Sequence, residues 1–286
     1  MNPPFKKLLA FSPAVMISVA LTFIVGAVLP PLAGLAIFVG GLVAMIVLLA
    51  GLGEDLAVRV LYRARRPSRA ETDALAPALA MLCQRGVPME RIRLRVQESS
   101  APIAAYGTGR RTLVVSTGLL GAVRDDQLPI DQTAAVLAHG TGVVLSGAVR
   151  SDPALEFWTL PWQVVRGLAH LLILPFRRLP LVGLAWKGRF VVAVIAAAQA
   201  VIADQTAVAA AIASGCALTY VAGVWERSWA AAVRDLGDDQ VRQWRLADSL
   251  ARVLLRCSRS AQTHERAHAL SGPSQRPTLA LVPSST

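Results

Sequence analysis

The chain has 286 residues, of which 54% are apolar and only 16% are charged, whereas a soluble globular domain carries roughly 25% charged residues. This composition argues against an ordinary cytosolic enzyme and strongly against a disordered chain. The net charge of +11 indicates an anionic neighbour, either nucleic acid or a membrane surface. The apolar excess favours the membrane, and no helix-turn-helix or RNA-binding signature supports nucleic acid as a partner.

The first part of the chain has the pattern of a membrane hairpin. No charged residue occurs from Leu8 to Gly53, and segments 9–29 and 32–52 each match the roughly 20 apolar residues that cross a bilayer. The pair Pro30-Pro31 predicts the turn between them. Lysines precede the first segment and arginines follow the second, so the positive-inside bias predicts that both ends of the hairpin are cytoplasmic. We therefore expect residues 1–53 to form a transmembrane helical hairpin of an integral membrane protein, with a cleaved signal peptide as the alternative for the first segment.

Residues 54–257 have the pattern of a mostly helical domain with a small sheet. A helix is predicted at 70–86, where acidic residues lie near the start and a glycine ends the pattern. A second, buried helix is predicted at 131–149, with Asp131 as its N-cap. Three short strands are predicted at 92–97, 102–106 and 112–116. The fold class is therefore mostly α with a small β-sheet, α+β.

Two further apolar segments, 157–176 and 190–203, leave their relation to the membrane open. The first contains Arg166 and His170 together with two prolines, and the second is short for a span. Both true spans and interfacial helices fit these patterns. Residues 258–286 form a polar C-terminal tail that we expect to be frayed.

Two strings within the domain resemble a known family. Residues 102–120 read PIAAYGTGRRTLVVSTGLL, and residues 136–142 read VLAHGTG. In this order, behind a hairpin anchor, they resemble the HtpX-like and CAAX-prenyl-protease-like membrane zinc metallopeptidases. The resemblance implies a cytoplasmic, zincin-like helical domain with an H-E-x-x-H helix. Its two histidines share a zinc ion, its glutamate acts as the general base, and a glutamate from a later helix completes the ligands.

The sequence departs from that family at the residues that carry the chemistry. His139 keeps the first ligand position, but Gly140 occupies the position of the general base and Val143 that of the second ligand. Ala200 stands where the third ligand is expected, while the nearby Asp204 is kept. A catalytic zinc ion needs three protein ligands. The resemblance therefore predicts a vestigial His139, no cofactor and no catalysis, with His139 bonded to a backbone carbonyl or to Asp204.

A second motif near the C-terminus gives the alternative hypothesis. Residues 264–268 read His-Glu-Arg-Ala-His, a literal H-E-x-x-H. In a helix His264 and His268 would share one face as zinc ligands, with Glu265 as the base. The polar flanks and the lack of a nearby third ligand count against this site, because such sites lie on buried helices that exclude water.

These observations predict a catalytically inactive pseudo-peptidase of the membrane. It would bind or regulate other membrane proteins, or bind extended peptides by strand addition at 102–106. The alternatives are an active membrane metalloendopeptidase that uses zinc, and a basic structural module of the lipid surface. The acidic pairs Asp125-Asp126 and Asp238-Asp239 are interpreted as solvated charges at helix starts or turns.

Overall fold

The computed structural model describes residues 3–98, 103–175, 180–257 and 260–272. It is mostly helical with one small mixed sheet, which confirms the predicted balance of helix and strand. The chain divides into two compact units that interleave in sequence. Unit 1 comprises residues 1–63, 108–110 and 147–234, and unit 2 comprises residues 64–107, 111–146 and 235–286.

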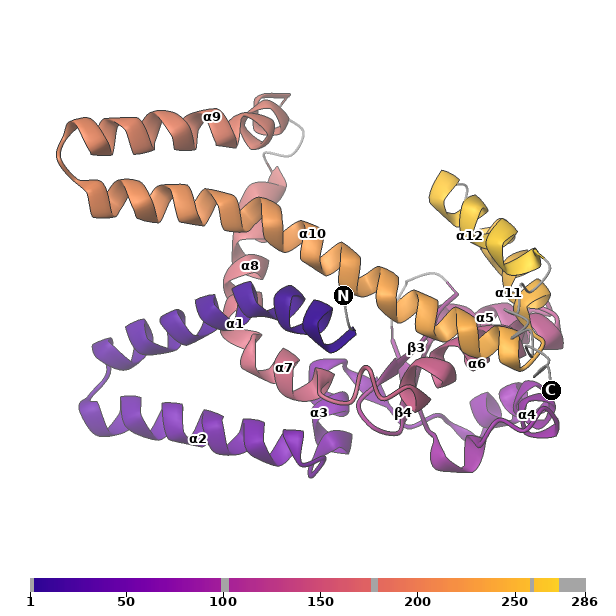
Figure 1. Cartoon of the computed structure of the whole chain (residues 1–286). Helices are drawn as coiled ribbons and strands as arrows, with labels where there is room; N and C mark the ends of the chain where they lie inside the picture. Colours follow the sequence, from indigo (N-terminus) through magenta and orange to yellow (C-terminus); the bar gives the residue numbers. More distant parts are fainter. Residues whose placement is uncertain (1–2, 99–102, 176–179, 258–259, 273–286) are drawn as a thin grey trace, which may run out of the picture. The chain divides into compact units, whose positions relative to one another are not determined.

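Unit 1 begins with the predicted helical hairpin (Figure 1). Helix α1 spans Pro3–Val28 and helix α2 spans Pro31–Leu49. The carbonyl of Pro30 accepts hydrogen bonds from the amides of Ala33 and Gly34 at 2.9 and 3.1 Å. A proline at the first position of a helix loses no intrahelical hydrogen bond, so the proline pair ends one helix and begins the next. The predicted turn is confirmed.

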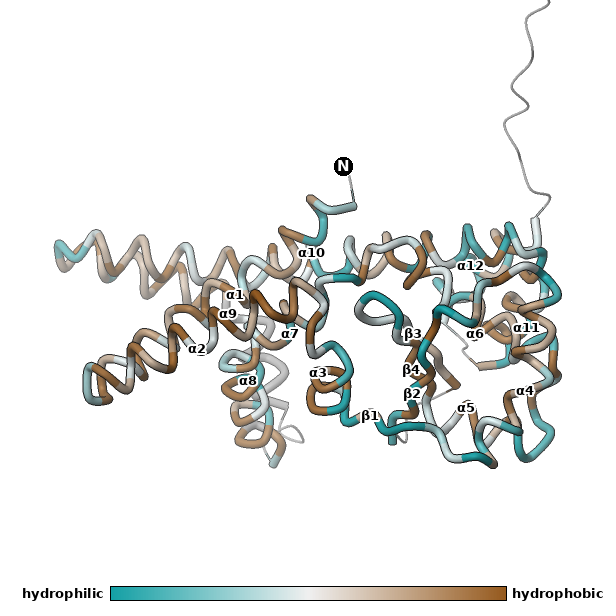
Figure 2. The backbone as a smooth tube through the Cα atoms, turned by 90° about the horizontal axis from the view of Figure 1, so that it is seen from below, coloured by the Kyte–Doolittle hydropathy of each residue, from teal (hydrophilic) through white to brown (hydrophobic). Residues whose placement is uncertain are grey.

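Three helices of the described residues are long and apolar enough to cross a membrane: α1, α2 and α10, which spans Thr206–Gln243. Helix α2 has no buried residue, and hydrophobic residues follow most of its length in Figure 2. Helix α10 was not predicted as a span. Its first part, from Thr206 to Val224, has no charge but consists largely of small residues, so its hydrophobic pattern is less obvious than that of α2.

The remaining helices of unit 1 are shorter or less apolar. Helix α9 lies beside α10, and the rings of Phe190 and Tyr220 meet edge to face with centroids 6.4 Å apart. The segments predicted at 157–176 and 190–203 are helical over most of their described residues, and residue 176 lies outside these. The bounds are α3 (Glu54–Leu61), α7 (Asp152–Trp158), α8 (Leu160–Ile173) and α9 (Pro180–Ile202).

Unit 2 is built on a four-stranded sheet with the order β1-β2-β4-β3. Strand β1 pairs antiparallel to β2, and β2 pairs parallel to β4 with Arg93 opposite Thr112. The predicted strands at 92–97 and 112–116 are confirmed within one residue. The third lies later than predicted, and residue 102 lies outside the described residues. The bounds are β1 (Ala64–Arg65), β2 (Arg93–Gln97), β3 (Ala105–Thr108) and β4 (Thr112–Ser116).

Helices cover this sheet and complete the core of unit 2. Helix α6 is buried along most of its length, as its apolar pattern predicted, and the core around it includes Leu82, Leu113, Leu137 and Val241. The helices are α4 (Arg69–Gln84), α5 (Thr117–Arg124), α6 (Ile130–Leu145), α11 (Ala247–Cys257) and α12 (Ala261–Ser271), with a 3₁₀ turn at Met89–Arg91.

The start of α4 is fixed by a capping box and an ion pair. Ser68 and Glu71 each accept a hydrogen bond from the other's backbone amide, which satisfies two donors at the helix start. Two nitrogens of Arg65 also donate to the two Glu71 oxygens at 2.7 Å each. These bonds from Arg65 lower the pKa of the buried Glu71 to about 2.

Two sequence predictions about unit 2 are wrong. The N-cap of α6 is Pro129, not Asp131, whose carboxylate instead accepts hydrogen bonds from Ser249 and Arg252 of α11 at 2.7 and 2.9 Å. The C-terminal tail is not frayed over its described part, because α12 buries Ala267 and Leu270 in the core. Residues 258–259 and 273–286 of the predicted tail lie outside the described residues.

Candidate functional site

The peptidase-like motif lies on α6, and its histidine faces the C-terminal part of α10. The Nδ1 atom of His139 lies 3.1 Å from Oδ1 of Asp238, off the line of a straight hydrogen bond. The imidazole ring packs directly on Gly237, where any Cβ atom would overlap the ring. The prediction that Asp204 is the partner of His139 is wrong. Asp204 is exposed at the turn before α10, and the carboxylate beside His139 is that of Asp238.

Asp238 is the centre of a small buried ion cluster. Its carboxylate is 6% exposed and accepts two hydrogen bonds from Arg266 of α12, from Nε at 2.8 Å and from Nη2 at 2.6 Å. This two-point arginine contact is the strong form of an ion pair. With its charge matched by Arg266 and one oxygen beside His139, the carboxylate holds three helices together.

Sequence analysis missed this cluster and interpreted Asp238 wrongly as a solvated charge. The signal was present in the helical spacing. Asp238 lies three residues before Val241, which is fully buried, so both fall on one face of a helix. Its neighbour Asp239 does face solvent and pairs with Arg242 at 2.7 Å. The partnership with Arg266 joins residues far apart in sequence and has no local signal.

The position of the family's general base is closed by the sheet. A Cβ atom on Gly140 would lie 2.5 Å from Cδ1 of Leu113 and 3.1 Å from the carbonyl oxygen of Ala105. Real Cβ atoms essentially never approach another heavy atom closer than 3.0 Å. A side chain at residue 140 would therefore require Leu113 to move and would press on the backbone of β3, so glycine fits best where α6 crosses β3 and β4.

Two further glycines extend this close packing on both sides of α6. A Cβ atom on Gly107 of β3 would lie 2.6 Å from the carbonyl oxygen of Gly140 and 2.5 Å from a methyl group of Val144. On the other side, a Cβ atom on Gly142 would lie 2.5 Å from Cβ of Gln240 on α10. These contacts show that α6 packs closely against β3 on one side and against α10 on the other.

The three ligand positions implied by the resemblance do not belong to one unit. His139 and Val143 lie in unit 2, where Val143 is 3% exposed within the core, and Ala200 lies in unit 1. Among the residues that the structure describes, no group of three or more His, Cys, Asp and Glu side chains is placed to hold a metal ion.

The second motif is helical, as its hypothesis requires, but it faces solvent. His264, Glu265 and His268 are all exposed on α12, whose opposite face carries the buried Ala267 and Leu270. Nδ1 of His264 lies 3.0 Å from the carbonyl oxygen of Ser260 in the preceding turn. The two histidines can therefore lie on one face of the helix, but that face lacks the enclosed surroundings in which a catalytic zinc ion works.

Comparison of this chain with models of known protein families, with curated proteins and with solved structures finds no match.

Proposed function

We propose that this chain is an integral membrane protein that resembles HtpX-like zinc metallopeptidases and works by binding other membrane proteins rather than by cutting them. The observation that carries the proposal is the contact at Gly140, where the place of the general base is filled by Leu113 and the backbone of Ala105. A metallopeptidase needs a base beside a metal-bound water, and a side chain at this position would have to displace Leu113 and press on the backbone of β3.

The surroundings of His139 support a structural role for this histidine. A ligand histidine of a catalytic zinc ion works with two further protein ligands and an open fourth position. His139 instead packs on Gly237 and lies beside a carboxylate that Arg266 already binds. The imidazole joins α6 to α10 and α12, which makes the helix part of a rigid frame.

The apolar helices support the membrane part of the proposal. Helices α1, α2 and α10 meet the length and hydropathy of spans, and the basic residues on both sides of the first hairpin favour cytoplasmic ends. In this arrangement the lipid bilayer is the constant partner, and unit 2 meets its protein partners at the cytoplasmic face.

Strand β3 is the element best placed for an extended partner. It is one of the two outer strands in the order β1-β2-β4-β3, and the other, β1, has only two residues. An outer strand can extend its sheet with a strand from another chain. The close contact between Gly107 and α6 holds this strand in place. An unfolded segment of a membrane protein is the partner chemistry that this geometry favours.

An assay with full-length protein in detergent tests both parts of the proposal, the binding of a membrane-protein segment and the absence of cleavage. Incubation with an unfolded membrane-protein segment is expected to give binding without chelator-sensitive cleavage. The control is the same segment with its backbone amides N-methylated, which should not bind because strand addition needs those donors. Chelator-sensitive cleavage that Glu265→Gln abolishes would overturn the proposal and establish the active hypothesis. Equal binding of the methylated segment would remove strand addition.

A further inference from the structure

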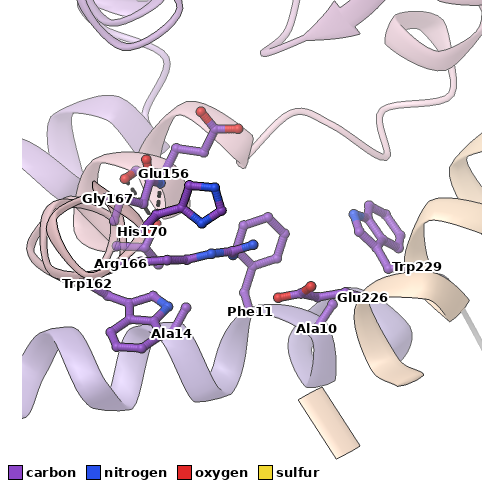
Figure 3. A pocket seen from close by; sticks show the side chains of 12 residues that line it. Ala10, Phe11, Ala14, Glu156, Trp162, Arg166, Gly167, His170, Glu226 and Trp229 are labelled. Carbon is purple, nitrogen blue, oxygen red and sulfur yellow. Dashed lines mark hydrogen bonds between the residues drawn. The ribbon is translucent and has the colours of Figure 1, made fainter. Parts of the chain in front are cut away.

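Unit 1 holds a cavity that has no part in the peptidase-like site. It has a volume of about 700 Å³ and lies between α1, the α7–α8 segment and α10 (Figure 3). This size is typical of sites for small molecules. Part of its wall is apolar and aromatic, formed by Ala10, Phe11, Ala14, Trp162 and Trp229.

Charged side chains of both signs line the same cavity. Arg166 and His170 lie one helical turn apart on α8, and Glu226 comes from α10. Figure 3 shows Arg166, Phe11 and Glu226 among the side chains that line this cavity. The cavity therefore offers the cation of Arg166 on one helix and the anion of Glu226 on another.

Arg166 and Glu226 have no charged partner within the described part of the chain. Neither forms a hydrogen bond or an ion pair with any of the residues that the structure describes, and they do not pair with each other. Both side chains are exposed, and ionisable groups beside membrane-spanning helices usually meet a partner. Two unpaired charges of opposite sign at one cavity indicate a ligand that carries both signs.

The other charged groups near the cavity are already engaged. Lys7 forms an ion pair with Asp152 at 2.6 Å, donates to the carbonyl of Ala148 at 2.7 Å, and lies 5.5 Å from the centre of the Trp229 ring. Glu156 is hydrogen-bonded to Tyr62, and burial raises its pKa to about 7. These contacts fix α1 and α7 as walls and leave Arg166 and Glu226 for the ligand.

We propose that this cavity binds the headgroup of an aminophospholipid. The phosphate lies against Arg166, the primary ammonium donates to Glu226, and the acyl chains follow the exposed apolar side chains of α8. Those side chains include Val164, Leu168 and Leu171. The apolar wall and the flanking candidate spans favour a lipid over a soluble ligand. This inference uses only the membrane part of the proposed function, so a failed peptide-binding test leaves it intact.

Native mass spectrometry of the full-length protein in detergent tests the assignment, with phosphatidylethanolamine, phosphatidylcholine and phosphatidylglycerol as probes. We expect phosphatidylethanolamine to bind at least about tenfold more tightly than the others, since a charge-assisted hydrogen bond is worth about one factor of ten or more. The quaternary ammonium of phosphatidylcholine cannot donate to Glu226, and phosphatidylglycerol has no ammonium.

Substitutions test which residue binds the phosphate of the headgroup and which binds its ammonium. Arg166→Gln is expected to weaken phosphatidylethanolamine binding about tenfold, and Arg166→Lys to restore part of it. Glu226→Gln is expected to remove the preference over phosphatidylglycerol. Arg227→Gln and Asp204→Asn are matched controls, because both residues are exposed in unit 1 and neither lines the cavity. Circular dichroism checks that each variant keeps its helices.

The outcomes separate the possible sites. Equal binding of the three lipids in the wild-type protein would overturn the proposal. Tighter binding of phosphatidylglycerol that depends on Arg166 but not on Glu226 would replace it with an anion site. Effects of the control substitutions as large as those of Arg166→Gln would show that general charge, rather than this cavity, binds the lipid.

Discussion

Helices α6 and α12 carry the two histidine motifs, and each lacks a different feature of a catalytic zinc helix. Helix α6 has the buried position of a catalytic helix but keeps only His139, beside Gly140 and Val143. Helix α12 has the complete His264-Glu265-x-x-His268 string but exposes it to solvent. A catalytic metal site needs both the residues of the motif and an enclosed position, and each of these helices supplies only one of the two.

Restoring the base on α6 is the strongest test of this comparison. Gly140→Glu is expected to destabilise the protein by more than about 4 kcal/mol, because its side chain overlaps Leu113 and brings a charge into the core. Chemical unfolding in detergent, or loss of folded yield, measures the effect. A stable Gly140→Glu variant would mean that α6 can open beside the sheet.

Gly140→Ala and Gly121→Ala provide a matched pair for the same contact. Alanine in place of a helical glycine adds about 1 kcal/mol of stability when there is room, as at Gly121, where no atom lies within 4 Å of the added Cβ. At Gly140 the overlap costs about 1–3 kcal/mol, so the two variants are expected to change stability in opposite directions.

The ion cluster beside His139 gives the next largest effect. Arg266→Gln leaves the buried Asp238 carboxylate without its main partner, and breaking such a pair costs about 3 kcal/mol. Hydrogen exchange should then increase along α12. The control is Arg242→Gln, which removes an exposed pair with Asp239 and a long, exposed hydrogen bond of 3.4 Å to the carbonyl oxygen of Ala269 on α12, and should cost less than about 1 kcal/mol. Equal effects would argue against a structural role for the cluster.

A second buried carboxylate extends the test to pH. The pKa of Glu71 is lowered to about 2 by Arg65, so its contribution to stability is complete above the ordinary glutamate pKa of about 4.3 and is lost as the pH falls toward 2. The free energy of unfolding should therefore decrease between about pH 5 and pH 2. A smaller decrease is expected in Glu71→Gln, and parallel curves would contradict the ion pair.

The exposed motif on α12 should give the smallest effects. His264→Ala and His268→Ala are each expected to change the free energy of unfolding by less than about 0.5 kcal/mol, since both side chains face solvent. Thermal unfolding with and without added zinc measures this. A zinc-dependent increase in stability that disappears in both variants would show that α12 binds the metal after all.

Hydropathy and local patterns predicted much of the fold. The proline pair at residues 30–31 located the hairpin turn, and the alternating and apolar stretches located β2, β4 and α6. The apolar first part of α10 was missed because Ala, Gly and Ser dilute its hydropathy. The N-cap of α6 was misplaced because Asp131 satisfies groups of α11 instead of its own helix.

The candidate site was less predictable because its contacts are long-range. The loss of the base and ligand positions could be read at Gly140 and Val143, but the reason for glycine could not, since Leu113 and Ala105 lie on strands distant in sequence. The pairing of Asp238 with Arg266 likewise depends on how α10 and α12 pack. Local sequence patterns identify the residues on a helix, whereas the packing of distant segments determines which atoms those residues contact.

The zinc content of full-length protein purified from zinc-replete cells is the decisive measurement for both histidine motifs. Because α6 packs closely against the sheet and α12 faces water, we expect far less than one zinc ion per chain, unchanged in His139→Ala and His264→Ala. One tightly held zinc ion per chain that either substitution removes would contradict it.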